Sequence, residues 1–153
     1  MDTIGALMHL LPGASATALP ILVHLETEYD LQIDPIARLS ALGGEPENHL
    51  RLSSAQKRTA MAYREFHDSP YETGYRLRDL ALHNLAISAA LRGENLEASK
   101  VESARIGMSA EFPVHARDLM PEFSGKALGD RLKELELRWI HSEFRLTKDQ
   151  LID

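Results

Sequence analysis

The chain has 153 residues, 44% of them hydrophobic, and a formal net charge of −6. A chain of this length can bury about two-thirds of its surface in one globular domain. The absence of cysteine excludes disulfides, thiolate zinc sites and cysteine nucleophiles, and it suits a reducing cytoplasm. The apolar runs are too short to span a membrane and the N-terminus lacks the order of a signal peptide, so we expect a soluble, cytoplasmic protein with no membrane partner.

Helical periodicity recurs along the whole chain, and no sustained alternation of apolar and polar residues indicates a strand. The helical segments predicted in chain order are residues 3–11, 15–29, 34–44, 46–50, 53–66, 71–91, 95–106, a long segment from residue 124, and 147–151. The segments at 46–50 and 147–151 are single turns or little more. The sequence therefore predicts an all-α fold: one domain over residues 1–153, with about seven to eight helices joined by short loops.

Two helix starts carry clear capping signals. Asp34 and Pro35 supply an N-cap and a first-turn proline. Ser53 and Gln56 have the spacing of a capping box, in which each side chain bonds to the backbone N–H of the other. Both helix starts are therefore predicted from hydrogen bonds between residues that lie within one helical turn of each other.

The segment of residues 71–91 is the most apolar in the chain and is predicted to be the central helix. Asn84 and Ser88 fall on its apolar stripe, so each needs a hydrogen-bond partner if it is buried. Gly93 is predicted to end this helix, and Gly107 the helix after it.

Residues 112–144 carry the most specific local signals: FPVHARDLMPEFSGKALGDRLKELELRWIHSEF. An extended lead and a short turn come first, Pro121 breaks the chain, and a long amphipathic helix follows. The apolar stripe of this helix consists of Leu128, Leu132, Leu135 and Trp139. Trp139 is therefore predicted to lie in the core rather than on a surface that stacks bases.

The start of that long helix combines a cap, two glycines and a cation. Ser124 is placed to be the N-cap, and Lys126 adds its charge at the positive end of the helix dipole. Gly125 and Gly129 would let another backbone come close. One interpretation is a cradle for the phosphates of a nucleic-acid backbone. The other is a tight joint between loop and helix with a solvated lysine.

These motifs resemble the C-terminal region of bacterial CCA-adding tRNA nucleotidyltransferases and their poly(A) polymerase relatives. The pattern FP-x-x-A-R-D-L-M-P followed by G-x-x-x-G-x-x-L-x-x-L-E-x-x-W is similar to the end of those enzymes. DPIARLSALGG, at residues 34–44, and LRLSSAQKR, at residues 50–58, are similar to two of their helices, in the same order. Ala116 departs from the family, which usually has glycine there. The resemblance covers nearly the whole chain.

The resemblance implies a module that binds tRNA through its body and tail and does not catalyse alone. The family carries its chemistry in an N-terminal head with a Gly-Ser motif and a D-x-D pair, and in a neck with E-D-x-x-R; this sequence has none of the three. Met1 would fall near the middle of such an enzyme. Mg²⁺ and ATP or CTP would bind that head, which is an expected partner along with tRNA, and this chain would hold no cofactor of its own. DNA is not an expected partner.

The net charge of −6 means that any RNA contact must be local. The candidate phosphate-binding residues are Arg51, Lys57, Arg58, Arg117 and Lys126. The candidate structural-turn residues are Asp118, Gly125 and Gly129. A cluster of cations can equally be a solvated face. Tyr63, Tyr71 and Tyr75, which lie near arginines, are candidates for stacking on bases.

Two other functions remain open on the residues alone. His67-Asp68 matches the doublet of HD-type metal-dependent phosphohydrolases, which are also helical, although His24, His83 and Asp79 are poorly placed to complete a metal site. The histidines show no H-E-x-x-H spacing, so no metal site is predicted. The last alternative is a helical module for protein interaction.

Overall fold

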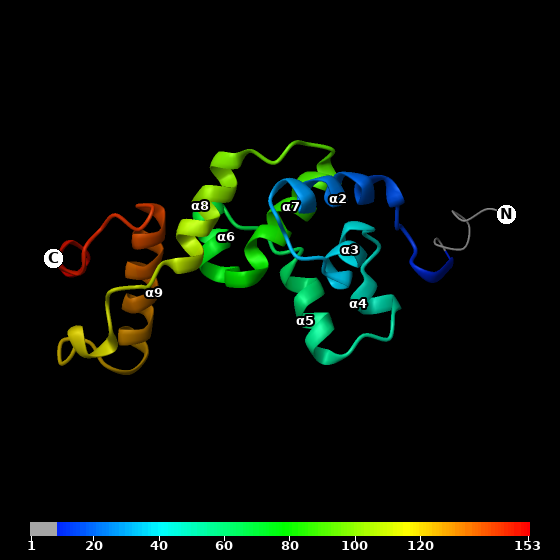
Figure 1. Cartoon of the computed structure of the whole chain (residues 1–153). Coiled ribbons are helices and arrows are strands. Elements are labelled where there is room, and N and C mark those ends of the chain that lie inside the picture. Colours follow the sequence, from blue (N-terminus) through cyan, green and yellow to red (C-terminus); the bar gives the residue numbers. More distant parts are fainter. Residues whose placement is uncertain (1–8) are drawn as a thin grey trace. The chain divides into compact units, whose positions relative to one another are not determined.

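Helices form all of the regular structure in the computed structural model, which describes residues 9–153 (Figure 1). The α-helices are α2 (Leu19–Glu28), α3 (Pro35–Ala41), α4 (Pro46–His49), α5 (Ser54–Ala62), α6 (Pro70–Leu77), α7 (Ala81–Arg92), α8 (Ala98–Ser109), α9 (Gly125–His141) and α10 (Lys148–Ile152). The 3₁₀ turns are η1 (Ala16–Ala18), η2 (Arg78–Leu80) and η3 (Ala116–Asp118). The helix predicted over residues 3–11 falls largely outside the described residues. Leaving aside the single turn α4, the elements bounded within residues 9–153 include eight α-helices, which confirms the all-α prediction.

The chain divides into two compact units, Met1–Met108 and Ser109–Asp153. The sequence predicted one domain over residues 1–153; along that length, the residues of each of the two segments contact mainly one another. Each unit also buries apolar side chains of its own. None of the described helices is both long enough and apolar enough to cross a membrane.

In the first unit α7 lies at the centre, where it packs against α2, α3, α6 and η1 (Figure 1). The core cluster consists of Ala18, Leu22, Leu25, Ala37, Ala41, Tyr63, Ala86, Ile87, Ala89, Ala90, Leu96 and Val101. Asn84 donates to the carbonyl oxygens of Ala62, at 3.0 Å, and Glu65, at 2.9 Å. This buried amide therefore has the partners it needs, and it joins the end of α5 to the central helix.

The segment predicted as one helix over residues 71–91 is instead α6 and α7, with η2 between them. The break falls at Arg78, whose φ of 49° lies in the left-handed region and cannot be part of a continuous right-handed helix. The Arg78 guanidinium donates to the carbonyl oxygens of Met108, at 2.9 Å, and Gly107, at 3.3 Å. The break is therefore accompanied by hydrogen bonds from Arg78 to the end of α8, and the apolar periodicity of the sequence could not predict these bonds.

Helices α6 and α8 approach each other closely at two glycines. A Cβ on Gly74 would lie 2.0 Å from the carbonyl oxygen of Ala104, and one on Gly107 would lie 2.2 Å from that of Tyr71. The prediction that Gly107 ends its helix is wrong, because α8 continues through it to Ser109. Glycine is present there because no side chain fits between the two backbones.

The helix starts that depend on local bonds are confirmed. The Asp34 carboxylate accepts the N–H of Ile36 at 2.8 Å. Ser53 and Gln56 make both bonds of a capping box. α5 nevertheless ends at Ala62, earlier than predicted. The predicted caps are confirmed because the two residues of each cap are close in sequence. The end of α5, by contrast, depends on the hydrogen bonds that Asn84 of α7 donates to Ala62 and Glu65.

In the second unit three aromatic rings pack around α9. Trp139 is 4% exposed, and its ring centroid lies 5.5 Å from that of Phe112 and 4.6 Å from that of Phe144. The lead before η3 and the chain after α9 are therefore both attached to the same helix. α10 begins with a capping box and buries Leu151. The prediction that Trp139 is a core residue is confirmed.

Candidate nucleic-acid interface

Residues 50–64 contain Arg51, Lys57, Arg58 and Arg64 and no acidic residue, although the chain as a whole has 23 acids and 17 lysines and arginines. We call these residues the α5 basic segment. α5 packs on α3 and α4, with Ala60 fully buried, so one side of the helix is covered and the other is open to solvent. Lys57 and Arg58 therefore stand on a helix that the core holds in place, with Arg51 before its start and Arg64 after its end.

The members of the α5 basic segment differ in what they contact. Arg51, Lys57 and Arg58 are exposed, and no carboxylate of the described residues forms an ion pair with any of them. Arg64, by contrast, lies 2.9 Å from a carboxylate oxygen of Glu47. Three of the predicted phosphate-binding residues thus share one segment with their charges unmatched, whereas Arg64 is already neutralised.

The other two predicted phosphate-binding residues belong to the second unit. Arg117 lies in η3, which packs against α9, and Lys126 lies in the first turn of α9. Both are exposed, and within residues 109–153 neither forms an ion pair. The structure thus sorts the five candidates into a set of three in the first unit and a set of two in the second.

The start of α9 differs in detail from the prediction. Ser124 occupies the N-cap position, but its side chain caps no backbone N–H. A Cβ on Gly125 or Gly129 would meet no atom of the described residues within 4 Å, so no other segment of that part of the chain approaches either glycine closely. Gly125 has a φ of 54°, which accounts for glycine at that position. Ala116 opens η3 without a positive φ, so the turn does not need the glycine of the family pattern.

Asp118 holds the turn before α9 together. Its carboxylate accepts the N–H of His115 at 2.8 Å and forms an ion pair with Lys148, the first residue of α10. Lys148, and after it the bond from His115, hold the pKa of Asp118 below its ordinary value. This carboxylate is thus engaged within the protein, and it joins the turn to α10.

The aromatic candidates for base stacking are largely engaged elsewhere. Tyr63 is 2% exposed, and its hydroxyl donates to Asp34. The ring of Tyr75 lies under the guanidinium of Arg78, 4.7 Å from its centroid. Phe66, which sequence reasoning missed, is 84% exposed. It lies after α5 between Glu65 and the polar run His67-Asp68-Ser69, and an aromatic residue in such polar surroundings is the signal that could have identified it.

The alternative of an HD-type metal site gains no geometric support. Within residues 9–153, no three histidine or acidic side chains gather closely enough to hold a metal ion. The Nε2 atom of His67 lies 3.6 Å from a carboxylate oxygen of Glu65, and the ring of His83 bonds to the carbonyl oxygen of Gln32 at 2.8 Å. The His83 ring is thus bonded to the backbone, whereas Nε2 of His67 makes no hydrogen bond within the described residues, and neither ring belongs to a group of three possible metal ligands there.

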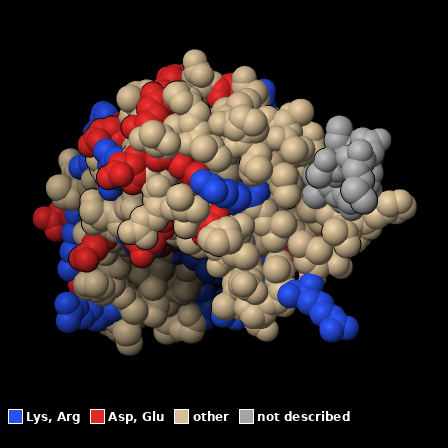
Figure 2. All heavy atoms as spheres, turned by 45° about the vertical axis from the view of Figure 1, so that its right-hand side comes forward, with Lys and Arg blue, Asp and Glu red and all other residues tan. Residues whose placement is uncertain are grey.

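The face of the molecule in Figure 2 carries its lysines and arginines dispersed among acidic and uncharged side chains. A nucleic-acid contact on such a surface would cover a small area, and the α5 basic segment is a small basic area.

No family model matches this chain, and no curated protein or solved structure matches it either.

Proposed function

We propose that this chain is the RNA-holding part of a tRNA nucleotidyltransferase of the CCA-adding or poly(A) polymerase type, acting in the cytoplasm. The α5 basic segment contacts phosphates of the tRNA acceptor and T-arm. The observation that carries the proposal is the exposure of Arg51, Lys57 and Arg58 without an ion-pair partner among the described residues, on a segment that lacks acids. Cations that the protein leaves unmatched can neutralise phosphates and release counterions.

The order of the three sequence motifs supports this family, and LRLSSAQKR, the second of them, includes the three unmatched cations of the α5 basic segment. The contribution of this chain is binding rather than catalysis. Nucleotide addition needs paired carboxylates that hold two metal ions, and the sequence contains no D-x-D pair. In this proposal Mg²⁺ and the nucleotide bind a head domain, and the present chain positions the tRNA for it.

Arg117 and Lys126 provide a second, smaller set of phosphate contacts. They extend from the turn before α9 and from the first turn of that helix, where unpaired N–H groups and the helix dipole also favour an anion. Their contribution is separable from that of α5, because the two sets lie in different units.

The test is filter binding of tRNA to the full chain across a series of salt concentrations. Each phosphate contact adds about −0.7 to −0.9 to the slope of log K against log salt concentration. A variant with Arg51, Lys57 and Arg58 all changed to Gln should therefore bind more weakly and flatten the slope by about 2 to 3. Changing Arg117 and Lys126 to Gln should flatten it by about 1.5.

The matched control removes the same net charge from cations that already have partners. Lys100, Arg131 and Arg145 form ion pairs with Glu97, Glu134 and Glu143, and their triple change to Gln should leave the slope nearly unaltered. Equal losses in the two triple variants would mean that only net charge matters. That result, or no salt-dependent binding at low ionic strength, would refute the proposal.

A further inference from the structure

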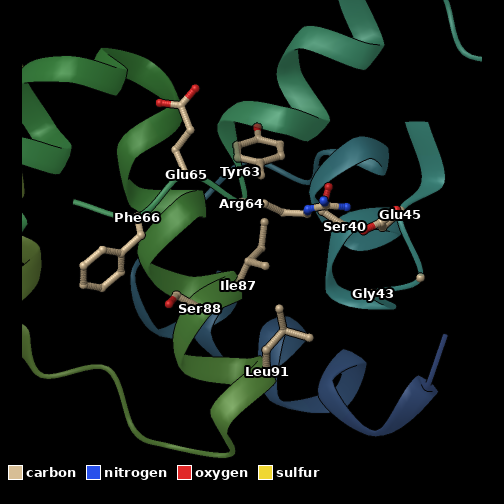
Figure 3. A pocket seen from close by; sticks show the side chains of 11 residues that line it. Ser40, Gly43, Glu45, Tyr63, Arg64, Glu65, Phe66, Ile87, Ser88 and Leu91 are labelled. Carbon is tan, nitrogen blue, oxygen red and sulfur yellow. The ribbon is translucent and has the colours of Figure 1, made fainter. Parts of the chain in front are cut away.

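The first unit contains a pocket of about 360 Å³ between α3, the end of α5 and α7 (Figure 3). Its lining includes Ser40 from α3, Tyr63 and Arg64 from the chain after α5, and Ile87 and Leu91 from α7. Tyr63 and Ile87 belong to the core cluster of this unit, so one wall of the pocket is part of that core.

Ser40 is the unusual member of this lining. It is 0% exposed, and its hydroxyl oxygen has no hydrogen-bond partner among residues 9–153. Buried hydroxyls in native proteins are nearly always bonded, because an unmatched one costs about 1–3 kcal/mol. A buried hydroxyl that lies beside a pocket and lacks a protein partner is expected to bond to a water or to a ligand atom in that pocket.

Arg64 adds further donors to the pocket. In Figure 3 its side chain runs from the end of α5 toward Ser40 and Glu45. Among the described residues, its Nη1 atom contacts both carboxylate oxygens of Glu47, at 2.9 and 3.2 Å, and its other two guanidinium nitrogens make no hydrogen bond there. The remaining N–H groups of this guanidinium, like the Ser40 hydroxyl, can donate to an acceptor.

The charges around the pocket limit the kind of ligand. Glu47 neutralises Arg64, and Glu45 and Glu65 add two negative charges to the lining. An anionic ligand would be repelled, whereas an uncharged carbonyl oxygen would still be attracted to the free N–H groups. The pocket therefore fits a neutral group that presents carbonyl acceptors.

The rest of the lining is suited to a flat apolar body. Ile87 and Leu91 supply aliphatic surface, and Leu91 is 51% exposed at the mouth. Phe66 also belongs to the lining and points outward in Figure 3, with 84% of its surface exposed. An exposed aromatic ring beside such a pocket is a stacking surface for planar groups.

We propose that this pocket receives one unpaired RNA base that carries carbonyl acceptors, such as uracil, with Ser40 and Arg64 donating to it and Phe66 stacking on a neighbouring base. This inference rests on the proposed RNA binding, because the α5 basic segment must hold the RNA phosphates for a base to come near the pocket. Arg58 precedes Tyr63 by five residues, which is about 7.5 Å along a helix. Along the helix axis, a strand held by α5 therefore needs only a few nucleotides to reach the end of the helix at which the pocket lies.

The experiment titrates the ¹⁵N-labelled full chain with uridine, adenosine and two ten-nucleotide RNAs, oligouridylate and oligoadenylate. Uridine should shift backbone resonances of residues 40–45, 63–66 and 87–91, with a Kd on the order of 1 mM, and adenosine should bind several-fold more weakly because it lacks a carbonyl. Ser40→Ala should weaken uridine binding by about five- to tenfold. Leu91→Trp should close the mouth and abolish uridine binding.

Leu137→Trp is the matched control, because Leu137 is a leucine with 43% exposure on α9 in the second unit. This variant should bind uridine as the unchanged chain does. If oligouridylate binds with the expected salt dependence but no pocket resonance responds, and Leu91→Trp binds like the unchanged chain, the pocket inference is overturned and the proposed function stands. If neither RNA shows salt-dependent binding, the proposed function fails, and the pocket inference fails with it.

Discussion

Replacing Gly107 by alanine should destabilise the first unit, although alanine is the better helix former. In an open helix interior this change stabilises by about 1 kcal/mol. At Gly107 the new Cβ would lie 2.2 Å from the carbonyl oxygen of Tyr71 and 2.9 Å from the backbone nitrogen of Tyr75, and neither backbone atom can rotate away. Overpacking costs about 1–3 kcal/mol, and contact with backbone belongs at the upper end. The expected net loss is about 2 kcal/mol, or a fall in Tm on the order of 8 °C.

Gly129 provides the control, because it also lies inside a helix but a Cβ there would meet no atom of the described part of the chain within 4 Å. Gly129→Ala should therefore stabilise by up to about 1 kcal/mol. Both variants are measured by urea and thermal unfolding, followed by circular dichroism. The reasoning predicts opposite signs for the same chemical change. Gly107→Ala raising the Tm, or both variants moving it equally, would show that α6 and α8 do not meet at these glycines.

Two further changes test contacts of the turn before α9 and of the core. Because Lys148 lowers the pKa of Asp118, their ion pair stabilises the fold above the ordinary pKa of 3.8, and this contribution is lost as pH falls through the lower folded-state pKa. Lys148→Met should therefore melt below the unchanged chain at pH 7, and the gap should close in acid; a gap independent of pH would contradict this. Burial, and then the bond to Asp34, raise the pKa of Tyr63, whose hydroxyl donates to that carboxylate. Tyr63→Phe should lose about 1.5 kcal/mol in urea unfolding, and no loss would be inconsistent with that bond.

The sequence predicted those features whose causes are local. Ser53 and Gln56 bond within one turn, so a four-residue pattern contains the whole interaction. Gly93 ends α7 with a φ of 66°, a conformation that glycine adopts readily. In both cases the residues that decide the structure are neighbours in the chain, and no knowledge of packing is needed.

The errors concern features whose causes are distant. Gly93 and Gly107 look alike in sequence, but the first ends a helix and the second lets two helices touch. Arg78 breaks an otherwise continuous apolar pattern, and its guanidinium bonds to carbonyls about thirty residues away. Periodicity records which face of a helix is apolar and carries no information about which backbone lies against it.

The features of the candidate site also divide into those with local causes, which the sequence shows, and those with distant causes, which it does not. Cations such as Lys57 and Arg58 can be identified from the sequence because charged side chains are exposed by default. The sequence does not show which cations are already paired with an acid, because partners such as Arg64 and Glu47 are seventeen residues apart. Ser40 looks like a small residue on a helical stripe, and its unmatched hydroxyl becomes apparent only when α3, α5 and α7 are assembled around it.

The net charge of −6 does not decide whether such a site binds RNA. At physiological salt the Debye length is about 8 Å, so acids farther than that from α5 contribute little to the potential that a phosphate meets there. What matters is the charge within that radius, and the α5 basic segment supplies Arg51, Lys57 and Arg58 with no acid in its own sequence. The acids elsewhere act at lower salt, where the screening length grows. Lowering the salt should therefore strengthen RNA binding less steeply than the five proposed contacts alone would predict. Adding an acid beside Lys57, for example by Gln56→Glu, should weaken binding far more than adding one near the C-terminal end of α9, away from Lys126.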